Sequence, residues 1–181
     1  MMASLDRHLK NKGYTLSIVR DREFTPKQSS TSISEEEEEI LWKSGKLGGN
    51  NPESLIQTMW WLLTQQFGLR GRQEHHGMRL EDFRIMNGDD GIAFVDGPFY
   101  LSIKYNRRAD DEIWYKVQPM GENKINSMMK SIISGTSLET SEKRFSNHSA
   151  RKTVVSKMKK ANLERSAIAK VTGHRNIQSF R

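Results

Sequence analysis

The strongest structural signal in the chain lies in residues 51–70, which read NPESLIQTMWWLLTQQFGLR. Asn51 can cap a helix, and Pro52 is favoured at a first helical position. The apolar residues that follow occupy most of a helix circumference: Leu55, Ile56, Met59, Trp60, Leu62, Leu63 and Phe67. We therefore expect a largely buried helix that forms the spine of the core. It delivers Arg70 from a rigid element, which suits a side chain that holds a ligand.

A second helix start precedes this one. Ser34 stands before the acidic run Glu35–Glu39, and Glu37 can complete a capping box with Ser34. Acidic side chains in a first turn also suit the positive end of the helix dipole, so we interpret the run as helix initiation rather than as a partner-binding patch. The glycine-rich residues 45–49 should end this helix.

Weaker patterns complete the fold. Apolar spacing predicts a helix over 123–134, another from a cap at Ser146 or Asn147, and a short one over 163–171 that Gly173 closes. The best strand candidates are residues 92–95, 99–105 and 113–117. We predict an α+β fold, mainly α, with a small antiparallel sheet. Residues 1–33 are expected to be a linker, and residues 34–181 a single domain.

Composition excludes several classes of site. The chain has no cysteine, so it can form neither a disulfide nor a cysteine-based zinc site. Its five histidines lack metal-ligand spacing, and the adjacent pair His75 and His76 is expected at a loop or core edge. No cofactor or metal is predicted. No apolar run approaches the ~20 residues of a membrane span, so we expect a soluble intracellular protein without a membrane partner.

Charge is distributed unevenly along the chain. Residues 143–181 hold eleven Lys and Arg against the single acid Glu164, a net charge of +10, whereas residues 1–142 hold eighteen bases and twenty-one acids, a net charge of −3. A basic surface attracts nucleic acid through counterion release. A solubilising surface would have the same composition, so charge alone leaves both interpretations open.

The basic end also carries a candidate phosphate site. His148 and Arg151 stand three residues apart in a predicted first helical turn, so both can face one ligand, and His174 follows after a further helix. A guanidinium grips phosphate oxygens in a fork, and an imidazole can donate a hydrogen bond or move a proton. A phosphodiester is the predicted ligand. The cations predicted to contact DNA nearby are Lys152, Lys157, Lys159, Lys160 and Arg175.

Arg70, His148, Arg151 and His174, in that order, resemble the active-site set of the tyrosine recombinases and phage-type integrases. More narrowly, Trp60-Trp61, Glu74-His75-His76 and residues 147–155 resemble the Crypton-derived recombinase domain at the C-terminus of zinc-finger MYM-type and related nuclear proteins. The resemblance covers residue 34 to the end. It implies a recombinase-like catalytic domain in residues 34–181, DNA as partner, nuclear location and no metal or cofactor. Residues 1–33 would then be the remnant of an N-terminal helical DNA-clamping domain.

The resemblance also implies roles. Arg70 and Arg151 would grip the phosphate, His148 would transfer a proton, and His174 would hydrogen-bond an oxygen. Arg72 is a rival to Arg70, because the spacing from Arg70 to Glu74 is one residue longer than the usual recombinase pattern. Arg70 is favoured, because Gly68-Leu69-Arg70 matches the family motif.

Two departures bear on catalysis. The fifteen residues between Phe83 and Phe99 contain no lysine, whereas recombinases carry one on a hairpin there, and Lys104 matches no family motif. The nucleophilic tyrosine would fall near position 183, beyond Arg181. The tyrosines at 100, 105 and 115 precede His148 and so stand in the wrong order.

Three hypotheses follow. The first is a non-catalytic, recombinase-like DNA-binding domain. The second is an active strand-exchange recombinase or integrase, acting through a 3′-phosphotyrosyl intermediate when a longer chain or a partner supplies the tyrosine and lysine. The third is a protein-interaction scaffold in nuclear complexes.

Overall fold

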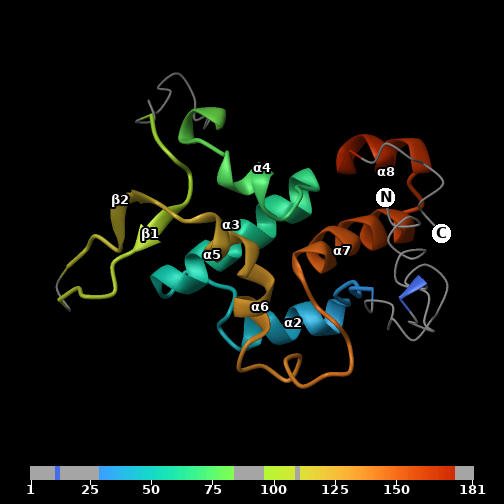
Figure 1. Ribbon diagram of the computed structural model, residues 1–181, viewed down its shortest axis with the longest axis horizontal. Coiled ribbons are helices and arrows are strands. Elements are labelled where there is room, and N and C mark those ends of the chain that lie inside the picture. Colours follow the sequence, from blue (N-terminus) through green and yellow to red (C-terminus); the bar gives the residue numbers. More distant parts are fainter. Residues whose placement is uncertain (1–10, 13–28, 84–95, 109–110, 174–181) are drawn as a thin grey trace.

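A computed structural model of the protein describes residues 11–12, 29–83, 96–108 and 111–173. Within these ranges the chain forms seven α-helices, one 3-10 turn and a two-stranded antiparallel sheet. The predicted α+β, mainly α class is therefore confirmed. The sheet lies at one end of the molecule and the last two helices lie at the other (Figure 1). None of the described helices is long and apolar enough to cross a membrane.

The first two long helices begin where their capping residues predict. Helix α2 is Glu35–Lys43, and the Ser34 N–H donates to Glu37 Oε2 at 2.8 Å while Ser34 Oγ accepts from the Glu37 N–H at 3.2 Å. Helix α3 is Pro52–Phe67, and Asn51 Oδ1 accepts from the first free amides of the helix. Gly68 ends α3 in the left-handed region at φ 60°, which costs glycine little.

The remaining helical elements are short except for one. They are α4 (Gln73–His76), the 3-10 turn η1 (Leu80–Asp82), α5 (Glu122–Asn126), α6 (Met128–Ile133), α7 (Asn147–Lys160) and α8 (Arg165–Thr172). The helix expected over 123–134 is two helices, because the backbone leaves helical geometry at Ser127, where φ is −94° and ψ is 8°. Ser146 is the N-cap of α7, and Gly173 closes α8 as expected.

The sheet pairs β1 (Leu101–Ile103) with β2 (Tyr115–Pro119). Leu101 lies opposite Pro119 and Ile103 opposite Tyr115, so the register shifts at a bulge between the two pairs. The strand expected over 99–105 is thus shorter, and the one expected over 113–117 begins two residues later. The bulge interrupts the ladder, which alternation in the sequence cannot reveal. The candidate strand at 92–95 lies outside the described residues.

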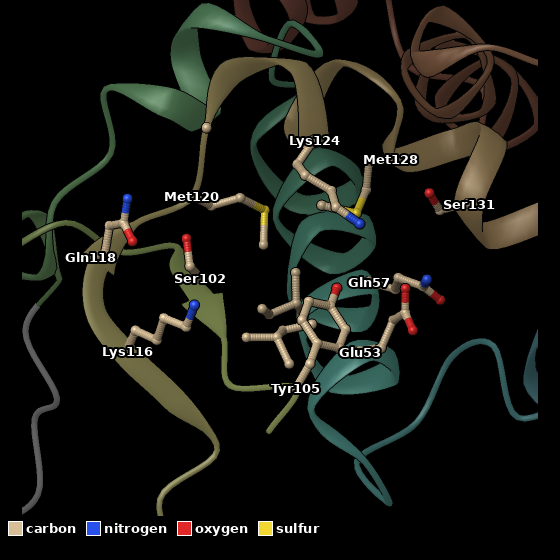
Figure 2. Close-up of a pocket in the computed structure, with 13 residues that line it drawn as sticks. Glu53, Gln57, Ser102, Tyr105, Lys116, Gln118, Met120, Lys124, Met128 and Ser131 are labelled. Carbon is tan, nitrogen blue, oxygen red and sulfur yellow. The ribbon is translucent and has the colours of Figure 1, made fainter. Parts of the chain in front are cut away.

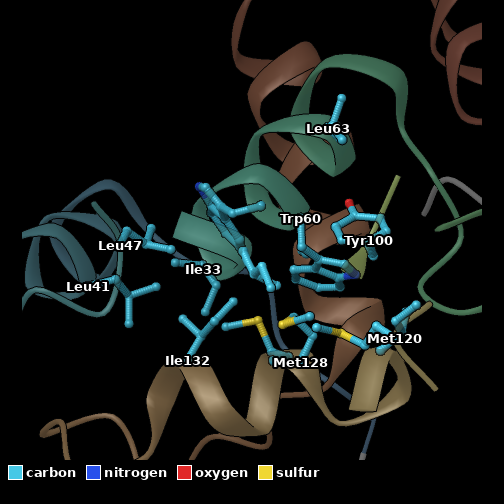
Figure 3. Close-up of a cluster of buried hydrophobic side chains, with 14 of the residues drawn as sticks. Ile33, Leu41, Leu47, Trp60, Leu63, Tyr100, Met120, Met128 and Ile132 are labelled. Carbon is cyan, nitrogen blue, oxygen red and sulfur yellow. The ribbon is translucent and has the colours of Figure 1, made fainter. Parts of the chain in front are cut away.

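The core forms around α3, which packs against α6 and α7 (Figure 3). Trp60 and Trp61 are fully buried together with Leu41, Met129 and Ile132, and burial of each such side chain contributes about 2 kcal/mol. The expectation of a core spine is confirmed. Leu62 and Phe67 nevertheless remain 39% and 56% exposed, so one strip of α3 faces solvent.

His75 lies inside the core, not at its edge as expected; only His76 is exposed. Thr64 Oγ1 donates to the Trp60 carbonyl at 2.8 Å, so it accepts from His75 Nε2–H at 2.9 Å. His75 Nδ1 then accepts from the Tyr100 hydroxyl at 2.9 Å. Because both ring nitrogens have partners, the imidazole can be buried without an unsatisfied polar atom.

Part of the segment expected to be a linker contacts α7. Ile33 is buried, and its N–H donates to Thr153 Oγ1 at 2.8 Å. The Thr31 N–H donates to the Arg144 carbonyl at 2.9 Å. Residues 29–33 therefore lie along the segment before α7 and the middle of that helix.

Candidate functional site

A cleft of about 530 Å³ lies between the loop after α3 and the start of α7. Arg70, Arg72 and His148 all line it, although they come from segments far apart in the sequence. The other lining residues are Gly71, Gln73, Glu74, Asn126, Ser146 and Asn147. The cleft thus combines two guanidinium groups and an imidazole with one carboxylate.

Close backbone packing fixes the loop that carries the arginines. A Cβ on Gly71 would collide with the Cβ of Asn147, so only glycine fits at this approach. A Cβ on Gly68 would lie 3.0 Å from the Val171 carbonyl oxygen. The loop is therefore held against the first turn of α7 and the last turn of α8.

Asn147 connects the cleft to three further elements. Its Nδ2 donates to the Gly71 carbonyl at 2.8 Å and to the Ile125 carbonyl at 2.9 Å, and its Oδ1 accepts from the Met129 N–H at 3.0 Å. One amide thereby fixes the start of α7 relative to the arginine loop, α5 and α6. The sequence suggested only a capping role for Asn147, because its partners lie up to 76 residues away.

The first turn of α7 faces the cleft. Ser146, Asn147 and His148 line it, and Ser149 Oγ accepts from the Ser146 N–H at 3.0 Å behind it. The helix has 14 residues, so its dipole places partial positive charge at this end. An anion in the cleft would meet the dipole as well as the side chains.

Both cleft arginines are partly engaged with exposed carboxylates. Arg70 Nε lies 3.7 Å from Glu74 Oε1, and the two side chains are 60% and 43% exposed. Arg72 Nε lies 3.7 Å from Glu122 Oε2, with both side chains 50% exposed. Exposed ion pairs of this kind contribute at most about 1 kcal/mol. A phosphate could therefore replace either carboxylate at little cost.

Arg151 lies beneath the loop and does not line the cleft. It is 9% exposed, Nη1 donates to the Gly68 carbonyl at 2.9 Å, and Nη2 donates to the Thr172 carbonyl. Burial, and after it the nearby charge of Arg70, lowers the pKa of Arg151. In this arrangement Arg151 ties the end of α3 to the end of α8 and so positions the loop that carries Arg70.

Arg70 also reaches the residue that precedes His174. Its Nη2 donates to the Gly173 carbonyl at 2.9 Å. His174 and Arg175 themselves lie outside the described residues. The structure thus brings Arg70 and His148 to one cleft, and Arg151 to the loop beneath it.

The lysines predicted to contact DNA lie elsewhere on α7, and none lines the cleft. Lys157 Nζ donates to Glu38 Oε2 at 2.6 Å and Lys160 Nζ donates to Glu35 Oε1 at 2.8 Å. Lys152 Nζ donates to Ser29 Oγ and to the Ser30 carbonyl, both at 2.7 Å, and Lys159 is exposed. The acidic first turn of α2 therefore has a second role, as the partner of α7.

Other chemistry is absent from the described part of this cleft. The tyrosines at 100, 105 and 115 do not line it, and Lys104 pairs with Asp111 at 2.9 Å. In the described ranges no group of three or more His, Asp or Glu could hold a metal ion. The cleft can bind an anion, and the described residues supply no nucleophile of the tyrosine type.

Comparison with known proteins gives one match. Residues 32–91 match a family described as "Domain of unknown function (DUF3504)". This range contains α2, α3 and α4, and it supplies Arg70 and Arg72 but not the α7 side of the cleft. No curated protein matches the chain, and no solved structure matches it. The chain is thus similar, over about a third of its length, to a domain whose description names no activity.

Proposed function

We propose that this protein is a recombinase-like DNA-binding domain whose cleft holds a backbone phosphate without cleaving it. The observation that carries the proposal is the presence of Arg70, Arg72 and His148 in one cleft at the N-terminus of α7. Half or more of protein–DNA hydrogen bonds go to phosphate and sugar, and arginine is the donor best shaped for them.

Electrostatics support an anionic ligand. The cleft holds two arginines against Glu74, and the helix dipole adds positive potential. Glu74 accepts from the Arg70 backbone N–H as well as facing its guanidinium, so it occupies the position that a phosphate oxygen would take. Binding of DNA would displace this carboxylate into solvent.

Binding rather than strand transfer is the activity that the described side chains support. Tyr100 is buried against His75, and the Tyr115 hydroxyl donates to the Pro52 carbonyl at 3.0 Å. Neither of these residues lines the cleft. The active-recombinase alternative requires a tyrosine and a lysine from a longer chain or from a partner.

Titration of a fluorescent DNA duplex, followed by anisotropy, tests the proposal. Arg70→Ala and Arg72→Ala should each weaken binding about tenfold, the loss expected for one charge-assisted contact. Arg108→Ala is the matched control, because Arg108 is exposed and lies outside the cleft. Equal affinities for all three variants and the unmodified protein would contradict phosphate binding at this cleft.

A nicked suicide substrate separates binding from catalysis. The proposal expects no protein–DNA adduct that survives denaturation in detergent, whereas an active recombinase would accumulate a phosphotyrosyl adduct. We extend the proposal to a nuclear location, since duplex DNA is the partner. Exclusion of the fluorescently tagged chain from nuclei would contradict that extension alone.

A further inference from the structure

A second cavity lies on another face of the molecule, between α3, the sheet and the helices α5 and α6 (Figure 2). Its volume is about 230 Å³. Ile56, Met120 and Met128 are 7%, 6% and 4% exposed and, with Ile103, form an apolar floor. None of the cleft residues described above lines this cavity.

Gln57 contributes a buried polar group to the wall. The residue is 4% exposed, and it is one of the residues that line the cavity. The amide can offer both a donor and an acceptor to a molecule in the cavity.

Two lysines stand at the rim. Lys116 lies on β2 and Lys124 on α5, and neither ammonium forms an ion pair with a described residue. The only carboxylate among the lining residues is Glu53. Two cations and one anion leave the lining with a net positive charge that a single carboxylate would neutralise.

We propose that this cavity binds a small aryl carboxylate, a single aromatic ring with a short arm that ends in a carboxylate. The ring would lie on the methionine and isoleucine floor, and the carboxylate would face Lys116 and Lys124. An apolar protein cavity of about 150 Å³ binds benzene, so the larger volume here accommodates a ring and its arm. Flexible methionine side chains adapt readily to such rings and make favourable sulfur–aromatic contacts.

Methionine methyl NMR tests the proposal with 3-phenylpropanoate as the probe. In protein with ¹³C-labelled methionine methyl groups, ring currents should shift the Met120 and Met128 signals saturably as the probe is added. Met158, which packs between α7 and α8, should not move. The neutral alcohol 3-phenylpropanol lacks the carboxylate, and propanoate lacks the aromatic ring. Each should therefore bind at least about tenfold more weakly than 3-phenylpropanoate.

Substitutions of the two rim lysines give a second test of the proposal. The double variant Lys116→Met with Lys124→Met should weaken binding of 3-phenylpropanoate by about tenfold or more while leaving binding of 3-phenylpropanol unchanged. Lys130→Met is the control, since Lys130 is an exposed lysine of α6 outside the cavity. The proposal is overturned by the absence of saturable shifts at Met120 and Met128 up to about 10 mM probe, or by unchanged affinity in the double variant.

Discussion

At the scale of single residues, the buried His75 gives the protein a built-in sensitivity to acid. Burial lowers the pKa of His75 from 6.5 to about 4. Between these two values the unfolded chain binds a proton that the folded protein does not, so stability falls as pH falls. Above pH 6.5 the histidine has no effect. At pH 5 His75 should lower the unfolding free energy by about 2 kcal/mol. The measurement is the difference between the unfolding free energies from urea titrations at pH 7.5 and pH 5.

Two substitutions distinguish His75 from other acid-sensitive groups. His75→Gln can keep hydrogen bonds to Thr64 and Tyr100 but cannot titrate. The fall in unfolding free energy between pH 7.5 and pH 5 should therefore shrink by most of about 2 kcal/mol. His76→Gln, at an exposed neighbouring position, should keep the full loss. An identical pH dependence in both variants would refute the assignment.

Asn147 is the residue that holds the cleft together. Its side chain makes three hydrogen bonds, to Gly71, Ile125 and Met129, each with a typical net value of about 1 kcal/mol. We expect Asn147→Ala to lower the unfolding free energy by about 2 to 3 kcal/mol in urea titrations. Asn126→Ala changes an exposed asparagine of the same cleft and should cost less than about 0.5 kcal/mol. If Asn147→Ala lowers the unfolding free energy no more than this control does, the three hydrogen bonds of Asn147 do not stabilise the fold.

At the scale of elements, α2 and α7 face each other through opposite charges. Lys157 Nζ donates to Glu38 Oε2 at 2.6 Å, and Lys160 Nζ donates to Glu35 Oε1 at 2.8 Å. These pairs lie at or near the surface, so they contribute little to stability. In the proposed DNA-binding role their larger effect would be on binding, because the glutamates would compete with DNA for the same ammonium groups.

Glu38→Gln should therefore tighten DNA binding, by about threefold, since it frees Lys157 for a phosphate. Glu39→Gln removes the same charge from the same helix, but Glu39 pairs with Lys43 within α2. Anisotropy titrations at one salt concentration compare the two variants. Equal tightening would mean that only the net charge of α2 matters and that its pairing with α7 does not.

Elements with strong local signals could be predicted from the sequence. Helices α2, α3 and α7 begin at their capping residues, and Gly173 ends α8 in the left-handed region. The expectation that Arg70 stands at the end of the spine helix was wrong, because α3 ends at Phe67 and Arg70 lies in the loop that follows Gly68. Features that depend on contacts between residues far apart in the sequence could not be predicted. The break at Ser127, the bulge between β1 and β2, and the burial of His75 each depend on partners that local periodicity does not contain.

The same division holds for the candidate site. A motif of residues far apart in sequence indicated Arg70 and His148, and both line the cleft. The sequence could not indicate that Arg151 would be buried under the loop, or that α2 would engage Lys157 and Lys160. Charge counts along a chain record how many cations exist but not which already have partners.

At the scale of the whole molecule, the number of cations without partners predicts the salt dependence of DNA binding. If all eleven bases of residues 143–181 neutralised phosphates, log K against log salt would have a slope of about −10. Among the bases that the structure describes, fewer are free to meet a phosphate, because Arg151 is buried and Lys157 and Lys160 contact α2. If the two cleft arginines dominate, the slope should be about −2.

Anisotropy titrations between about 50 and 200 mM NaCl measure this slope. Each of Arg70→Ala and Arg72→Ala should reduce its magnitude by about 1, whereas Arg108→Ala should leave it unchanged. A slope near −10 that neither cleft substitution alters would mean that DNA binds the basic end as a diffuse surface. A phosphate held between the α3 loop and the first turn of α7 requires a slope near −2. In the variant that lacks both cleft arginines the slope should fall toward zero, since no other described cations would then contribute.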